Sequence, residues 1–227
     1  MMGLMGLGQV ATQQPPITRD ISGWFDVASW DNTTKIWRDK SNNDKTATDI
    51  TGTPNVKTST ASGAADIETI YGDTGDAIRF PDSVLPSSDA YTVFAVTRYD
   101  GGNQNRIVTN LAGGNTYLLG HHYFKAGVCY YPPSGNANTW ADYYGSNWVI
   151  SCGQNRPDYY ETNGLNRAMA NVSGQSDPPS SIGLNIKTDE TSDWACVEMI
   201  FYKANLTQEE IDDVTKYLGA KYSITLE

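Results

Sequence analysis

The chain has 227 residues, a formal net charge of −10 at pH 7, and 16 lysines and arginines against 26 aspartates and glutamates. This balance predicts no basic surface that could neutralise nucleic-acid phosphates, and no apolar run is long enough to span a membrane as a helix. The 14 tyrosines, 6 tryptophans and 21 glycines are instead typical of a turn-rich, all-β protein.

Residues 1–19 are predicted to form an extended arm in front of a single domain that covers residues 20–227. The first 16 residues are apolar and glycine-rich, and they end in Pro15-Pro16. Their glycines interrupt the apolar run and no basic residue precedes it, so the segment does not fit a signal peptide. An apolar end of this kind is mobile unless protein surface holds it. We therefore expect the arm to contact protein neighbours in an assembly.

The domain is predicted to consist of short strands separated by Gly, Pro, Asn and Asp turns. Alternation and β-branched or aromatic content place strands at residues 21–30, 35–39, 76–80, 91–98, 106–110, 116–121, 125–131, 148–152, 158–162, 166–169, 181–186 and 193–202. Residues 45–75 are more polar and are expected to give short strands and loops. This pattern predicts a two-sheet antiparallel sandwich or jelly roll.

The last strand and a terminal helix are the most sharply predicted elements. Strict alternation over residues 193–202 would place Ala195, Val197, Met199 and Phe201 on one face, and Trp194, Cys196, Ile200 and Tyr202 on the other. Only Glu198 breaks the apolar content of the second face, so both faces are expected to be covered. A helix should then begin after Thr207, because Thr207 and Glu210 form a capping-box pattern, and Ile211, Val214 and Leu218 make an apolar stripe at helical spacing.

The three cysteines show no spacing typical of a zinc site. Cys196 lies in the buried strand and is expected to be a small core residue. Cys129 and Cys152 could pair only if their strands are neighbours with suitable geometry; burial as separate thiols is the alternative.

The C-terminal motifs resemble the end of a laminin-G-like module of the concanavalin A-like lectin and glucanase superfamily, of the kind found in large-virus and cell-surface proteins. They are Trp194-Ala-Cys-Val-Glu198, Phe201-Tyr-Lys203, Leu206-Thr-Gln-Glu-Glu-Ile211 and Tyr217-Leu-Gly-Ala-Lys-Tyr222. Weaker matches follow in the same order upstream, from Gly23-Trp-Phe-Asp26 through Tyr91-Thr-Val-Phe-Ala-Val-Thr-Arg-Tyr99 to Asn147-Trp-Val-Ile150 and Asn163-Gly164. The resemblance implies a concanavalin A-like sandwich, a fold shared by lectins, glycan-active enzymes, adhesion modules and structural parts of virus particles. The fold alone does not choose among these functions.

The catalytic motif of the glucanases in this superfamily is incomplete here. Those enzymes use Glu-x-Asp-x-Glu on one strand, and the nearest match is Ala64-Ala-Asp-Ile-Glu68, in which Ala64 stands at the nucleophile's position. The two histidines, His121 and His122, are adjacent and would face opposite sides of a strand, which disfavours a catalytic triad or a shared metal. We therefore expect no catalytic residues and no enzyme activity.

No cofactor is predicted, with calcium as a minor alternative. Sandwiches of this superfamily often bind calcium through loop oxygens, and the two acidic turns that could supply them are Asp100 with Asn103, and Asp73 with Asp76.

A glycan site is predicted around one aromatic loop. Sugar sites combine aromatic faces with side chains that hydrogen-bond hydroxyl groups. Residues 123–144 hold that mixture, and the candidate ligand-binding residues are Tyr130, Tyr131, Asn136, Trp140, Asp142, Tyr143 and Tyr144. The same aromatic residues are equally typical of a core or a subunit interface.

Together these features predict a non-catalytic structural or attachment module of a larger assembly such as a virion, with surface glycans as candidate ligands. The expected location is a virion or the extracellular face of a cell. A glycoside hydrolase-like enzyme of the same fold is the alternative.

Overall fold

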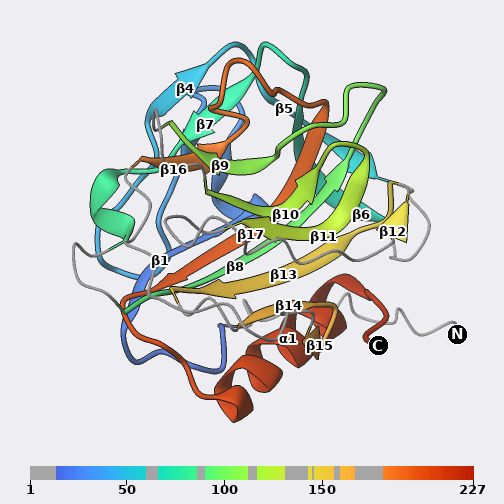
Figure 1. Cartoon of the computed structure of the whole chain (residues 1–227). Helices are drawn as coiled ribbons and strands as arrows, with labels where there is room; N and C mark the ends of the chain where they lie inside the picture. The colour runs from blue at the N-terminus through green and yellow to red at the C-terminus, as the bar shows by residue number, and fades with distance from the viewer. Residues whose placement is uncertain are drawn as a thin grey trace, which may run out of the picture.

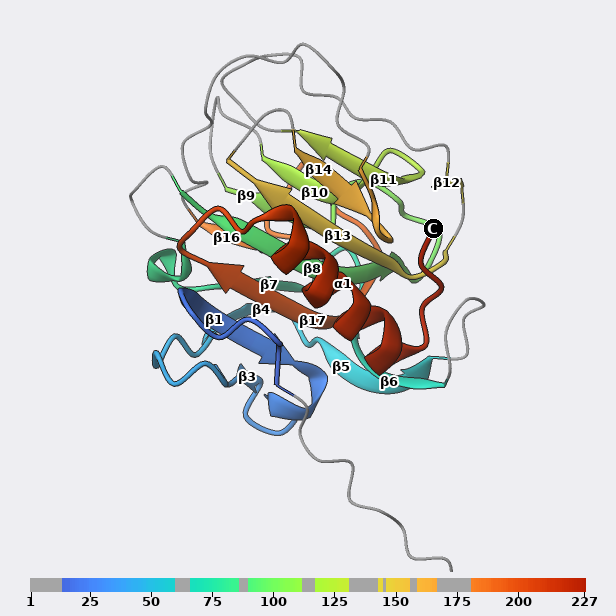
Figure 2. The same ribbon diagram turned by 90° about the horizontal axis from the view of Figure 1, so that it is seen from below.

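The computed structural model describes residues 14–59, 66–85, 90–111, 117–130, 143–144, 146–155, 159–166 and 181–227. Two antiparallel sheets face each other and one helix covers the outer side of the larger sheet (Figures 1 and 2). The predicted two-sheet antiparallel sandwich with a C-terminal helix is confirmed.

The larger sheet has eight strands. Its path is β15 (Leu165–Asn166), β14 (Tyr160–Thr162), β13 (Val149–Gln154), β8 (Thr92–Tyr99), β17 (Trp194–Tyr202), β6 (Ile67–Gly72) and β5 (Asn55–Ser59). Strand β1 (Ile21–Asp26) pairs with the second half of β17, beyond the part that pairs with β6.

The second sheet has seven strands, in the order β12 (Tyr143–Tyr144), β11 (Lys125–Tyr130), β10 (Leu118–His122), β9 (Val108–Asn110), β16 (Ile182–Leu184), β7 (Ala77–Arg79) and β4 (Asp49–Thr51). A small hairpin of β2 (Trp30–Asp31) and β3 (Ile36–Trp37) and two 3₁₀ turns, η1 (Val27–Ser29) and η2 (Asp82–Val84), complete the sandwich. The expected strand over residues 21–30 is thus divided, because the turn η1 interrupts it.

Two apolar cores explain why the central strands are buried on both faces. The first fills the space between the sheets and includes Val93, Val108, Leu119, Met199 and Phe201. The second lies between the eight-stranded sheet and helix α1 (Gln208–Tyr222), which crosses that sheet in Figure 2. A strand covered on both sides has no need of a polar face, so the long apolar run of β17 follows from its central position.

Helix α1 begins as predicted. The Thr207 hydroxyl accepts a hydrogen bond from the Glu210 N–H, and the Glu210 carboxylate accepts one from the Thr207 N–H. These two bonds satisfy donors that the first turn leaves without helical partners. Ile211, Val214 and Leu218 are buried against the sheet.

The strict alternation predicted for β17 is wrong after Cys196. The pairing of β17 with β8 shifts between Cys196 and Glu198, as at a β-bulge, where an extra residue reverses the facing of everything that follows. Met199 and Phe201 therefore face the inter-sheet core, whereas Ile200 and Tyr202 join Ala195 and Val197 on the helix side.

Cys129 and Cys152 form no disulfide. Cys129 belongs to the core between the sheets, whereas Cys152 belongs to the core under the helix. The eight-stranded sheet therefore lies between the two thiols and keeps them apart. Cys196 is fully buried in the inter-sheet core, as expected.

The last residues of the predicted arm contact the sandwich itself. The Tyr202 hydroxyl donates to the Ile17 carbonyl at 3.0 Å, and Arg19 forms an ion pair with Glu210 at 2.6 Å. Residues 1–13 lie outside the described part of the chain, so the contact of the arm with a neighbouring protein stays a prediction. No described helix is long and apolar enough to cross a membrane.

Candidate functional site

Several loops that are distant in sequence meet at one end of the sandwich, near the top of Figure 1. Backbone hydrogen bonds join the β8–β9 loop to the β16–β17 loop. The Asp100 N–H donates to the Asp193 carbonyl, and the Arg106 N–H donates to the Glu190 carbonyl. The turn between β10 and β11 joins them through a bond from the Phe124 N–H to a carbonyl of the β8–β9 loop. A rigid sheet that carries a cluster of tied loops is a common base for a binding site.

Asn185 ties the turn between β6 and β7 to the same cluster. Its side-chain amide donates to the carbonyls of Asp73 and Asp76 at 3.1 and 2.9 Å, and its amide oxygen accepts from the Ser192 N–H at 2.7 Å. Asn185 is 3 % exposed and has a left-handed backbone, with φ 57°. Asparagine tolerates that conformation better than most residues, so one side chain both turns the chain and holds two loops together.

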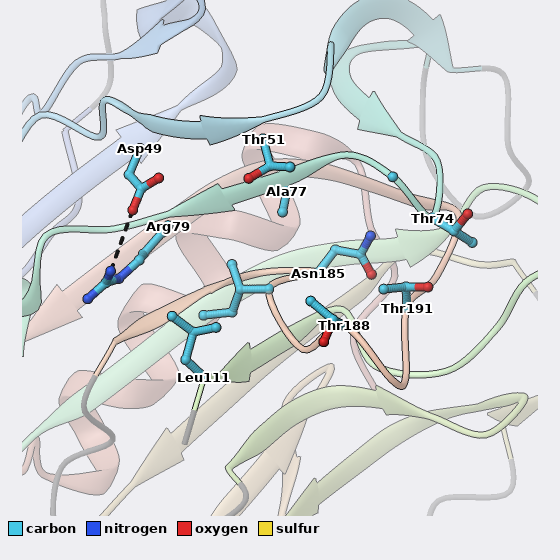
Figure 3. Close-up of a pocket in the computed structure, with 11 residues that line it drawn as sticks. Asp49, Thr51, Thr74, Ala77, Arg79, Leu111, Asn185, Thr188 and Thr191 are labelled. Carbon is cyan, nitrogen blue, oxygen red and sulfur yellow. Dashed lines mark ion pairs between the residues drawn. The ribbon is translucent and has the colours of Figure 1, made fainter. Parts of the chain in front are cut away.

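A hollow of about 360 Å³ lies between these loops and the edge of the seven-stranded sheet. Figure 3 shows Thr51 and Ala77 on one side of it and Leu111 and Thr188 on the other, with Arg79 at one end and Thr74 and Thr191 at the other. Its full lining is Asp49, Thr51, Thr74, Gly75, Ala77, Arg79, Leu111, Asn185, Ile186, Thr188 and Thr191.

The chemistry of this hollow is that of hydrogen bonding to neutral groups. Four threonine hydroxyls can donate and accept, and Leu111 and Ile186 add apolar surface. The charged groups are Asp49 and Arg79, whose side chains lie 3.5 Å apart as an ion pair. Asp49 is the single carboxylate among the described lining residues, whereas glycoside hydrolysis ordinarily requires two.

An ion-pair cluster joins the β16–β17 loop to Arg106 and His122. Glu190 pairs with Arg106 at 2.6 Å and approaches His122 at 3.4 Å, and Lys187 lies 3.4 Å from the same carboxylate. Burial and the charge of Arg106 lower the pKa of His122 below its ordinary value, although Glu190 opposes the shift. The lowered pKa favours the neutral form of His122, and the cluster acts as a positioning element for the loop that carries Thr188 and Thr191.

The two histidines point to opposite sides of β10, as predicted. His121 is fully buried between the sheets beside Tyr99 and Thr97, and burial lowers its pKa to about 3. It faces away from His122 and takes no part in the hollow.

The predicted glycan residues are only partly visible. Tyr131, Asn136, Trp140 and Asp142 lie outside the described residues. Tyr130 ends β11 opposite Leu118, whereas Tyr143 and Tyr144 form β12 opposite Ala126 and Lys125. Tyr130 lies four residue steps along β11 from Ala126, the partner of Tyr143, which is roughly 13 Å along a strand. Strands β11 and β12 lie at the opposite edge of the sheet from β4 and β7, so Tyr130, Tyr143 and Tyr144 lie on strands away from the hollow. The aromatic glycan site itself stays a prediction.

The two acidic turns proposed for calcium are engaged within the protein. Asp100 forms ion pairs with Arg98 and Lys57, and Asn103 donates to Asp193. The Asp76 carboxylate accepts from the backbone N–H groups of Thr53 and Asp73. Within the described ranges, no group of three or more His, Cys, Asp or Glu side chains could hold a metal ion.

Asp66 and Glu68 are both exposed and flank the buried Ile67, and Glu68 lies on β6 opposite Thr58 of β5. Glu68 thus belongs to the eight-stranded sheet, and neither carboxylate lines the hollow. Ala64 lies outside the described residues.

Sequence reasoning missed an exposed aromatic pair at the tip of the β10–β11 hairpin. Tyr123 and Phe124 are 64 % and 51 % exposed, and their ring centroids lie 5.6 Å apart. Both have left-handed backbones, with φ 52° and 64°. A two-residue hairpin turn with positive φ at both positions normally holds Asn-Gly. The predicted strands at 116–121 and 125–131 left this turn between them, but the sequence Tyr-Phe gave no sign of its backbone conformation or its exposure.

We predict that the double substitution Tyr123→Asn with Phe124→Gly stabilises the protein. Bulky residues in the left-handed region cost about 1–2 kcal/mol each, and Asn-Gly relieves most of that strain. The free energy of unfolding, measured by urea denaturation, should rise by about 1 kcal/mol or more. The control is Leu165→Asn, which removes an exposed apolar side chain from β15; an equal gain in the control would show that strain is not the cause.

Three solved structures share the fold of this chain. Domain 4 of AbnA, a GH43 extracellular arabinanase from Geobacillus stearothermophilus, in complex with arabinotriose, superposes with a TM-score of 0.65 at 14 % identity, over 86 % of this chain and 98 % of that domain. The binding domain of Paraclostridial Mosquitocidal Protein 1 gives 0.59 at 12 % identity, and Trypanosoma rangeli sialidase in complex with sialic acid gives 0.60 at 13 %.

The superposition on the toxin binding domain includes 88 % of this chain and 53 % of the other, and the superposition on the sialidase includes 92 % of this chain and 34 % of the other. No protein-family model matches the sequence, and no curated protein sequence matches it either. At these identities the superpositions show a common sandwich fold, and the laminin-G-like assignment remains a resemblance.

Proposed function

We propose that this protein is a non-catalytic module that recognises a glycan, and that the ligand binds in the hollow between β4, β7 and the β16–β17 loop. The observation that carries this proposal is the lining itself: hydroxyl groups and an ion pair beside the apolar side chains of Leu111 and Ile186. Sugars present the same alternation of hydroxyl groups and C–H surface. The volume of about 360 Å³ lies at the lower end of the range of small-molecule sites.

The superposed structures support the same class of ligand. One of them is a domain solved with arabinotriose, a neutral oligosaccharide, and this chain covers 98 % of that domain. Loops tied to one another by Asn185 and by backbone hydrogen bonds would present a largely preformed site, which reduces the entropy lost on binding.

Substitution of Ala77 by Trp tests this proposal. Ala77 is half-buried on the wall of the hollow, opposite Leu111 and Thr188 in Figure 3, and an indole there would fill the space. We expect at least a tenfold loss of affinity for the best ligand on a glycan array, confirmed by calorimetric titration. Thr188→Trp fills the hollow from an exposed position on the opposite wall, so it gives the same answer if Ala77→Trp disturbs the strand.

The matched control is Thr58→Trp, which adds an indole to an exposed position of β5 on the other sheet. Its affinity should equal that of the wild type. A normal glycan affinity in both Ala77→Trp and Thr188→Trp, with unchanged melting temperatures, would overturn the placement of the site.

Attachment to a larger assembly, at a virion or a cell surface, is a wider hypothesis. It rests on the apolar composition of residues 1–13, and contacts of that segment with another chain would support it. The glycoside hydrolase alternative would require a second carboxylate beside Asp49, and release of reducing sugar from a bound glycan would be its sign.

A further inference from the structure

A second hollow continues the first along the edge of the sheet. It has a volume of about 210 Å³ and is lined by Thr48, Asp49, Arg79, Phe80, Pro81 and Asp82. Asp49 and Arg79 line both hollows. The ion pair between Asp49 and Arg79 therefore lies at the boundary between the two hollows.

The separation of Ala77 and Pro81 along the chain indicates the combined length of the two hollows. Ala77 lines only the first hollow and Pro81 only the second; Ala77 opens β7, which ends at Arg79, and Phe80 and Pro81 continue the chain. Four residue steps of chain span at most roughly 13 Å when fully extended, which is more than the width of one sugar ring. Together the hollows form a groove along β7 with the dimensions of a short oligosaccharide.

Arg79 is fixed at the boundary by three partners. Its guanidinium lies 3.5 Å from Asp49, donates to Asp82 at 3.0 Å and donates to the Ser181 hydroxyl at 2.8 Å. A guanidinium held in this way is a preorganised donor, and its charge is already compensated. Asp49 and Asp82 are both 63 % exposed, so the boundary presents more negative than positive charge to the solvent.

We propose that this groove binds a linear, neutral oligosaccharide across both hollows, with the Asp49–Arg79 pair contacting sugar hydroxyls at the boundary. This inference rests on the proposed function and adds the length and the charge class of the ligand. A uronate or sialate would have to displace Asp49 or Asp82 from Arg79 and would meet the net charge of −10 of the chain. Like charges without compensation weaken binding.

The length of the ligand is tested with ladders of neutral oligosaccharides derived from arabinan, galactan and glucan, from two to six residues. In the wild type, affinity should rise at least fivefold between the shortest and longest members of the ladder that binds. Thr48→Trp fills only the second hollow from an exposed position. It should remove that rise and leave the affinity for the disaccharide unchanged, whereas Ala77→Trp should weaken every length.

These variants separate the two proposals. An unchanged length dependence in Thr48→Trp, with binding still lost in Ala77→Trp, overturns the extended groove and leaves the first hollow as the glycan site. Binding that neither substitution affects overturns both proposals, as does the absence of binding to every ladder. Thr58→Trp again serves as the control for an added surface indole.

The charge class is tested with oligogalacturonates of matched length. We expect their affinity to be at least tenfold lower than that of the neutral ladder at 50 mM salt, with a smaller difference at 500 mM because salt screens the carboxylates. Asp82→Asn should narrow the difference at low salt, since it removes an exposed carboxylate from the second hollow alone. Tighter binding of the acidic ladder by the wild type would overturn the neutral class.

Discussion

Glu198→Ala is expected to lower the free energy of unfolding by about 3–5 kcal/mol, the range for removing one partner of a buried ion pair. The Glu198 carboxylate is 1 % exposed in β17 and accepts hydrogen bonds from four side chains. The donors are Trp24 of β1 at 2.7 Å, and Tyr217, Lys221 and Tyr222 of α1 at 3.3, 2.7 and 2.5 Å. Its loss would leave Lys221 with the Asp26 carboxylate at 3.2 Å and the Tyr217 hydroxyl at 3.1 Å.

Glu198→Gln is the matched variant, because it keeps the shape and removes the charge. The single amide oxygen of glutamine cannot accept from all four donors, and its NH₂ group would face donors that it cannot bond. We therefore expect the free energy of unfolding to fall by about 2 kcal/mol, less than in Glu198→Ala. Urea denaturation followed by tryptophan fluorescence would measure both values. A loss below about 0.5 kcal/mol in Glu198→Ala would mean that this carboxylate does not hold the helix to the sheet.

The pH dependence of this difference has a definite sign. Burial raises the pKa of Glu198 above its ordinary value of 4.5, although Lys221 opposes the shift. A carboxyl group with a raised folded-state pKa contributes its full stability below the unfolded-state pKa and loses part of it as the pH rises through the folded-state pKa. The gap in stability between the wild type and Glu198→Gln should therefore narrow as the pH rises from about 4.5 towards 7.

Gly183→Ala is expected to destabilise the protein by about 3 kcal/mol, at the upper end of the range for overpacking. A Cβ at Gly183 would lie 2.4 Å from the Ile78 carbonyl oxygen and 2.7 Å from a methyl group of Ile186. The first contact is with backbone, which cannot rotate away. Because Gly183 pairs with Arg79 across β16 and β7, the displaced strand should also weaken glycan binding in the groove.

The control for this substitution is Gly102→Ala. A Cβ at that position meets no atom within 4 Å, so its stability should stay within about 0.5 kcal/mol of the wild type. Thermal melting of the two variants, with titration by the best neutral oligosaccharide, checks both effects. Equal stability of the two variants would show that β7 and β16 can separate without loss.

Part of the candidate site could be predicted from sequence and part could not. The turn at Asn163-Gly164 was predicted correctly, because asparagine and glycine carry the preference for turns themselves. The hollow was missed, because its walls come from residues 49–51, 74–79, 111 and 185–191. Threonines spread over such distances carry no local signal, and only sheet pairing brings them together.

The amino-acid sequence by itself determined the antiparallel sandwich and helix α1, because alternation, turn residues and the Thr207 capping box act over a few neighbouring residues. It also marked Glu198 as an unusual residue in an apolar strand. The tertiary structure alone decided which way that residue points. The register shift at Cys196 and Glu198 arises where β8 pairs with β17, and it turns Glu198 towards α1 and Met199 towards the other sheet. A period-two pattern is local, whereas a bulge is a property of two paired strands.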